Sequence, residues 1–169
     1  MAERVAEVNV VIEEKGWLKE LASPEDFATA VIRTAWQEAA KNGAKIPDEG
    51  YAEIGLFLVN DAEIKELNRE YRKIDKPTNV LSFPAMEDDI LIVGDMPFLA
   101  GDIIVALETT RKEAEENRQS LADHFAHLLV HGCLHLAGYD HENDDEAEIM
   151  ESLETQILAG MGIKNPYAE

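Results

Sequence analysis

Histidine is concentrated in one short part of this sequence, because all five histidines lie between residues 124 and 141. Residues 121–137 have the apolar spacing of a helix. His131 and His135 are four residues apart, so a helix places both imidazoles on the same face. Such a pair can reach a common metal ion, which is how helical zinc sites begin.

A third histidine follows a turn signal. Gly138 lies three residues after His135 and can end the helix by adopting a positive φ, and the chain can then bring His141 back over the first two histidines. Three nitrogen ligands leave the fourth position of a tetrahedral zinc ion open, as in catalytic sites. The alternative is a polar helix face whose histidines make ordinary hydrogen bonds. The pattern H-x-x-x-H-x-x-G-x-x-H favours a site for one Zn²⁺ ion formed by His131, His135 and His141.

The same spacing occurs in metzincin proteases, whose motif is H-E-x-x-H-x-x-G-x-x-H. In those enzymes the glutamate after the first histidine is the general base. Gly132 stands at that position here. A zinc metallopeptidase of metzincin-like geometry is therefore an alternative that the sequence disfavours.

Positive charge is confined to a few places. Residues 119–163 contain no lysine or arginine but nine acids. By contrast, four bases fall within eight residues, which we call the basic segment: Arg69, Arg72, Lys73 and Lys76. This segment is the best candidate for contacts with RNA phosphates. The alternative is a solvated helix end whose charges complement the helix dipole.

Four further residues are candidate neighbours of the site. His127 precedes His131 by one helical turn and could support the metal site by orienting its ligands. The alternative is that His127 is an ordinary buried histidine without a role at the site. Asp102 could hydrogen-bond a ligand imidazole or fix the start of a strand. We expect a surface position for His124 and core packing for Cys133.

The patterns of the remaining sequence predict an α+β (α/β-type) fold, with a small mixed, mostly parallel sheet of four strands surrounded by about five helices. The zinc site would lie on a C-terminal helix and turn. The expected strands cover residues 4–13, 51–59, 80–83 and 103–107. The clearest expected helices cover residues 24–42, 62–72, 121–137 and 144–159. Residues 84–100 are acidic and contain proline and glycine, so we expect a loop there.

Composition limits the class of protein. A chain of 169 residues with 46% hydrophobic residues suits one domain, 1–169, with a sizeable core. No apolar run approaches the roughly 20 residues of a membrane span, and the first residues lack the layout of a secretory signal. With a single cysteine, these features favour a cytoplasmic protein without a membrane partner. The net charge of −20 counts against broad, nonspecific binding of nucleic acid but leaves room for a local basic groove.

Two long segments resemble the YbeY family of bacterial rRNA maturation factors. Residues 127–141 (HLLVHGCLHLAGYDH) look like the signature of that family, and residues 67–83 (LNREYRKIDKPTNVLSF) resemble its second segment. Gly101-Asp102-Ile103 is a third, shorter likeness. The resemblance implies that His131, His135 and His141 bind zinc and that Arg72 is the essential arginine of the active-site groove. Arg72 and His131 are therefore the expected catalytic residues.

The resemblance also implies an activity, namely a single-strand-specific, zinc-dependent endoribonuclease in 16S rRNA 3′-end maturation and ribosome quality control. Its partners would be rRNA, the small ribosomal subunit and associated proteins. A second alternative is a non-catalytic ribosome assembly factor that contains zinc. The sequence assigns neither a general base nor an oligomeric state.

Overall fold

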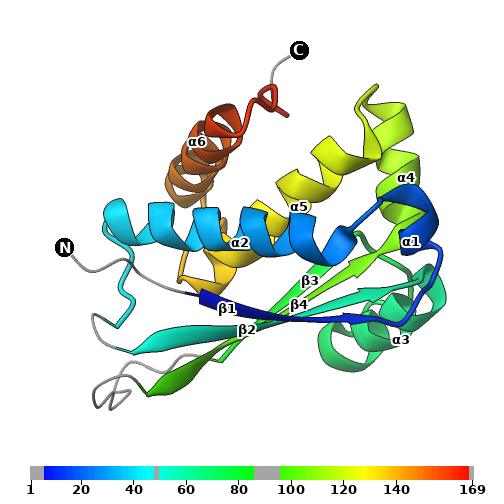
Figure 1. Ribbon diagram of the computed structural model, residues 1–169, viewed down its shortest axis with the longest axis horizontal. Coiled ribbons are helices and arrows are strands. Elements are labelled where there is room, and N and C mark those ends of the chain that lie inside the picture. Colours follow the sequence, from blue (N-terminus) through cyan, green and yellow to red (C-terminus); the bar gives the residue numbers. More distant parts are fainter. Residues whose placement is uncertain (1–5, 48–49, 86–95, 168–169) are drawn as a thin grey trace.

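The computed structural model describes residues 6–47, 50–85 and 96–167. Within these residues the chain forms four strands and six helices, shown in Figure 1. The strands are β1 (Ala6–Ile12), β2 (Tyr51–Val59), β3 (Val80–Pro84) and β4 (Pro97–Ala106). The helices are α1 (Trp17–Glu20), α2 (Pro24–Lys41), α3 (Asp61–Arg72), α4 (Leu107–Glu116), α5 (Leu121–Leu136) and α6 (Asp144–Gly160).

The four strands form one sheet in the order β1-β2-β4-β3. β1 and β2 are parallel, β2 and β4 are parallel, and β3 runs antiparallel to β4 at the edge. Helices α2, α5 and α6 lie on one side of this sheet, whereas α3 lies on the other (Figure 1). The predicted α+β class and the mixed, mostly parallel four-stranded sheet are confirmed.

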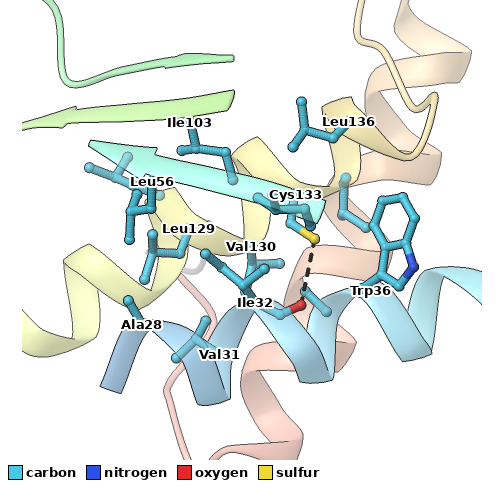
Figure 2. Close-up of a cluster of buried hydrophobic side chains, with 14 of the residues drawn as sticks. Ala28, Val31, Ile32, Trp36, Leu56, Ile103, Leu129, Val130, Cys133 and Leu136 are labelled. Carbon is cyan, nitrogen blue, oxygen red and sulfur yellow. Dashed lines mark hydrogen bonds between the residues drawn. The ribbon is translucent and has the colours of Figure 1, made fainter. Parts of the chain in front are cut away.

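The main core lies between the sheet and helices α2 and α5. Alternate side chains of β2 point into it, namely Ile54, Leu56 and Leu58, since successive strand residues face opposite sides of a sheet. Figure 2 shows the side chains of α2 and α5 that meet them, among which the Cys133 thiol donates to the carbonyl of Ile32 at 3.6 Å. This packing fixes α5, the helix that carries four of the five histidines.

A smaller cluster covers the other face of β4. It includes Val59, Ile64, Leu81 and Ile104 and packs beneath α3. β4 is thus apolar on both faces over residues 103–106, because helices cover both sides of the sheet there.

The predicted loop over residues 84–100 is wrong at its end. Residues 86–95 lie outside the described residues, but β4 begins at Pro97. Phe98 and Ala100 are buried on the core face while Leu99 is exposed, which is the alternation of a strand. The bulge that follows interrupts this alternation, so the sequence pattern did not reveal the strand. The register shifts there, so that Glu53 pairs with Leu99 and Ile54 with Gly101.

Two smaller differences concern helices. Leu107 begins α4 rather than ending the strand, and the short helix α1 was not predicted. Trp17 of α1 is fully buried, and its indole N–H donates to the carbonyl of Val59 at 3.1 Å. Within residues 6–47, 50–85 and 96–167, none of the helices has both the length and the apolar character needed to cross a membrane.

Candidate metal centre and its cleft

Three imidazoles converge at the C-terminal end of α5. His131 and His135 lie one turn apart in its final turns, and the chain reverses at Gly138, whose φ is +104°. This turn brings His141 toward the other two, and one side-chain nitrogen of each histidine lies within 4.8 Å of the other two. The ring centroids are 4.6 Å apart for His131–His135, 5.5 Å for His131–His141 and 5.0 Å for His135–His141.

The hydrogen bonds of the first two rings leave one nitrogen of each available. The Nδ1–H of His135 donates to the carbonyl of Tyr139 at 3.0 Å, and the Nδ1–H of His131 donates to Oε1 of Glu154 at 2.5 Å. In the neutral rings the Nε2 atoms then carry lone pairs, and these atoms are 3.1 Å apart. Two lone pairs repel at this separation unless a cation lies between them. Tetrahedral zinc with Zn–N bonds of about 2.0–2.1 Å places its ligand nitrogens about 3.3 Å apart, so the donor set fits zinc.

The protonation state of His135 also suits a metal ligand. Burial, and after it the neighbouring imidazoles of His131 and His141, lower the pKa of His135 to about 4. The ring is therefore neutral at pH 7, the state in which an imidazole nitrogen can bind a metal ion.

A glutamate that the sequence analysis missed lies behind His131. Glu154 of α6 is 0% exposed and accepts hydrogen bonds from His131, from Nε2 of His127 at 3.3 Å and from the hydroxyl of Tyr167. Burial alone would raise the pKa of Glu154, but these donors outweigh burial and lower it to about 2. The sequence did carry one signal, since Glu154 interrupts the buried face of α6 formed by Met150, Leu153 and Ile157.

The candidate metal centre opens into a cleft of about 570 Å³. Arg72, the last residue of α3, lines the cleft together with the three histidines, and its Nη2–H donates to the carbonyl of Ser82 at 3.4 Å. Helix α3 ends there because Lys73 adopts a left-handed conformation with φ of 62°. The cleft is lined by Arg72, Asn79, Val80, Ser82, Pro84, His127, Leu128, His131, His135, Asp140, His141, Glu142 and Tyr167.

The rest of the basic segment lies outside the lining of this cleft. Arg69 forms an exposed ion pair with Glu66 at 2.5 Å, and Lys73 donates to the carbonyl of Glu70 at 3.2 Å. Lys76 is exposed beyond the end of α3. Among the described residues that line the cleft, Arg72 is thus the member of the basic segment that faces the histidines.

The structure separates the two residues that were predicted to support the ligands. His127 lines the cleft and shares Glu154 with His131. Asp102 lies elsewhere, because its carboxylate occupies the space over Gly55, on the face of β4 opposite to Ile103 and α5. Burial raises the pKa of Asp102.

The predicted surface position of His124 is wrong. This residue is 5% exposed, and its Nε2 lies 2.8 Å from Oε1 of Glu113. Glu113 also accepts from the side-chain amide of Asn79 at 2.9 Å. The hydrogen bonds from His124 and Asn79 lower the pKa of Glu113 despite its partial burial, with the bond from His124 having the largest effect. His124 therefore anchors α5 to α4 and, through Glu113, to Asn79 in the cleft.

Gly132 faces the sheet and not the cleft. A Cβ atom at this position would lie 3.0 Å from Cγ2 of Ile103 and 3.1 Å from Oγ of Ser82. The glutamate of a metzincin protease therefore has no room at this position, which removes the residue that peptide hydrolysis would need as general base.

The fold and the site together define an α+β protein with a candidate three-histidine metal centre that opens into a surface cleft beside an arginine. The family model described as "Endoribonuclease YbeY" matches residues 14–162. The chain therefore belongs to the endoribonuclease YbeY family, as the sequence resemblance predicted.

Curated relatives of the same name match over nearly the whole chain. The endoribonuclease YbeY of Azorhizobium caulinodans is 51% identical over 162 residues, which cover 96% of each chain. That of Allorhizobium ampelinum is 46% identical over 166 residues, covering 96% of this chain and 95% of the relative. Among solved structures, the solution structure of a Thermotoga maritima protein is 27% identical, covers 92% of each chain and gives a TM-score of 0.52.

Proposed function

We propose that this protein is a zinc-dependent endoribonuclease that cleaves single-stranded RNA in 16S rRNA 3′-end maturation and acts in ribosome quality control. The nuclease part of the proposal is supported by membership of the endoribonuclease YbeY family. The site is supported by one geometric observation, that Arg72 and the three imidazoles line the same cleft. The proposed partners are rRNA, the small ribosomal subunit and its associated proteins, in the cytoplasm.

In this proposal His131, His135 and His141 hold the zinc ion through their ring nitrogens. When bound, zinc would supply a Lewis acid that polarises a phosphoryl oxygen of the RNA. Hydrogen bonds hold the imidazoles of His131 and His135 in fixed orientations, so that these two ligands need little reorganisation when the ion and substrate bind.

Arg72 would bind the phosphate next to the bond that is cleaved. Its guanidinium uses one N–H for the carbonyl of Ser82, which aims the group into the cleft and leaves other donors for a phosphate. A guanidinium can bind two phosphate oxygens at once and stabilise the charge that develops on them. The remaining bases of the segment, Arg69, Lys73 and Lys76, would contact neighbouring phosphates from the exposed end of α3.

The test is cleavage of a labelled 16S rRNA 3′-end precursor, with zinc content measured on every sample. We expect Arg72→Ala to bind zinc normally but to cleave about 100-fold or more slowly, as happens when a donor to a developing charge is removed. Arg72→Lys should restore little, because an ammonium group lacks the forked geometry. Arg111→Ala is the matched control, since Arg111 forms an exposed ion pair with Glu20 and does not line the cleft.

His131→Ala separates this proposal from its alternatives. We expect this variant to lose both zinc and cleavage. If it loses zinc but processes the precursor at the normal rate, the metal is not catalytic, and the protein is better described as an assembly factor. A panel of fluorescent peptides incubated beside the RNA tests the peptidase alternative, for which we expect no hydrolysis.

A further inference from the structure

Glu154 is a buried carboxylate that neither the family comparison nor the sequence analysis assigns to the site. It lies on α6, 23 positions after His131, and is 0% exposed. We propose that Glu154 is a positioning residue of the metal centre, which holds His131 with Nε2 directed toward His135 and His141 and is itself held by His127 and Tyr167. This inference rests on the metal centre of the proposed function.

Glu154 holds the ring of His131 in one orientation. A hydrogen bond of 2.5 Å to Oε1 of Glu154 fixes the proton of the neutral ring on Nδ1 and leaves Nε2 as the lone-pair atom. His135 is oriented differently, by the backbone carbonyl of Tyr139. A carboxylate also makes the imidazole a stronger ligand than a carbonyl does, so Glu154 contributes affinity as well as orientation.

The sequence around Glu154 offers few fixed positive charges. Between Arg118 and Lys164 the sequence has no lysine or arginine, and the ion pairs recorded for Glu154 are with imidazoles, His127 and His131. An ionised carboxylate without exposure to water needs opposite charge or several donors nearby. His131, His127 and Tyr167 direct donors at the two carboxylate oxygens of Glu154, and a cation bound at Nε2 of His131 would add opposite charge through the ring.

The residues after α6 fold back toward Glu154. The chain turns at Gly162, whose φ is +78°, and the backbone N–H of Tyr167 donates to Oδ1 of Asn165 at 2.8 Å. Asn165 in turn accepts from the hydroxyl of Thr155 on α6 at 3.3 Å. These bonds fold the segment back onto α6, so that the Tyr167 hydroxyl donates to Oε2 of Glu154 while the side chain, 44% exposed, lines the cleft. The C-terminal segment thereby forms part of the metal centre.

The test measures zinc affinity by competition with a chromophoric chelator for the full-length protein and its variants. We expect Glu154→Gln and Glu154→Ala to weaken zinc binding by about 10–100-fold, the usual effect of losing a residue that orients a ligand. Tyr167→Phe removes one of the donors to Glu154 and should weaken binding by less than about 10-fold. Glu148→Gln, an exposed position on the same helix, is the matched control and should leave the affinity unchanged.

A second readout distinguishes positioning from general damage to the fold. Two-dimensional ¹⁵N–¹H spectra of the metal-free histidine side chains report which ring nitrogen carries the proton. We expect the Nδ1–H form of His131 to be lost in Glu154→Ala and retained in Glu154→Gln, whose amide oxygen can still accept. The form of His135 should not change, because Tyr139 holds it independently.

The outcomes separate this inference from the function on which it rests. If the wild type binds zinc tightly and Glu154→Gln and Tyr167→Phe bind it equally tightly, the positioning role is wrong while the zinc-dependent nuclease stands. If the wild type does not bind zinc, the proposed function and the positioning role both fail. Glu154→Gln and Tyr167→Phe carry the test even where Glu154→Ala does not fold, because both keep the shape of the side chain.

Discussion

The close packing of Gly132 on α5 against Ile103 of β4 predicts the effect of adding one methyl group. In Gly132→Ala the new Cβ would lie 3.0 Å from Cγ2 of Ile103, 3.1 Å from Oγ of Ser82 and 3.4 Å from Cδ1 of Ile103. Ile103 is 0% exposed in β4, with strands on both sides, so it cannot move aside easily. Overpacking of this kind costs about 1–3 kcal/mol, whereas alanine in place of glycine in a helix gains up to about 1 kcal/mol.

The expected net result is a loss of about 1 kcal/mol in the free energy of unfolding. For a chain of this length that corresponds to a fall of about 2–4 °C in the melting temperature. Urea unfolding followed by circular dichroism measures the change, with the slope m as a check that the unfolded state is unaltered. Gly160→Ala is the matched control, because this helical glycine has no atom within 4 Å of the added Cβ, and it should not destabilise the protein.

An increase in the free energy of unfolding of Gly132→Ala would contradict this prediction. If Gly132→Ala stabilises the protein as much as an unhindered helical alanine does, then α5 can move away from β4, and the steric reason against a glutamate at this position is invalid. Gly132→Glu is the stronger form of the test. It should fail to fold or lose several kcal/mol, since it places a charge against buried Ile103 without a partner.

Four further predictions follow from the same structure. The Cys133 thiol is 0% exposed and burial raises its pKa, so the native protein should react with a thiol reagent at least about 100-fold more slowly than the unfolded protein. A side-chain hydrogen bond with Glu13, then burial and nearby negative charges, raise the pKa of Glu63 from 4.5 to about 7. The associated stability is complete below pH 4.5 and lost as the pH rises through 7, so Glu63→Gln should gain stability relative to wild type between pH 5 and pH 8 in urea titrations. Zinc at about 100 times its dissociation constant should stabilise the metal-free protein by about 2.7 kcal/mol in calorimetry, and His131→Ala should show no such gain. For single-stranded RNA bound by the basic segment, the logarithm of the binding constant plotted against the logarithm of the salt concentration should have a slope no steeper than about −3. Arg72→Ala should reduce the magnitude of this slope by about 0.7. A much steeper slope would indicate that RNA binds to a different surface.

The convergence of the histidines could be predicted because it depends on local geometry. The separation of four residues between His131 and His135 defines one helix face, and Gly138 is a residue that reverses a chain readily. The sequence predicted a mixed, mostly parallel sheet of four strands but not the order of the strands in it. Parallel and antiparallel neighbours follow from contacts between distant segments, which alternation within a strand does not specify.

The contribution of α6 to the candidate metal centre could not be predicted, because it depends on how α6 packs against α5. The position of Glu154 on the apolar face of α6 is a signal in the sequence, but most acids of this helix are exposed, and only the structure shows that Glu154 is buried. The prediction of a surface position for His124 failed for the same reason, since its partner Glu113 belongs to α4 and not to the same helix. In each case the missing information is a contact between helices. Periodicity gives the face of a helix but not the neighbour that covers it.

The net charge of −20 is compatible with an RNA substrate once distance is considered. At physiological ionic strength the screening length is about 8 Å, so acids on remote surfaces act weakly on a phosphate that is already in contact with the protein. Within the cleft the balance is set by a few groups, with Arg72 on one side and Asp140 and Glu142 beside the histidines. A bound divalent cation would offset the two negative charges on the histidine side. The same acids that repel RNA from the metal-free cleft would then favour retention of the cation, so metal loading should control RNA binding as well as cleavage.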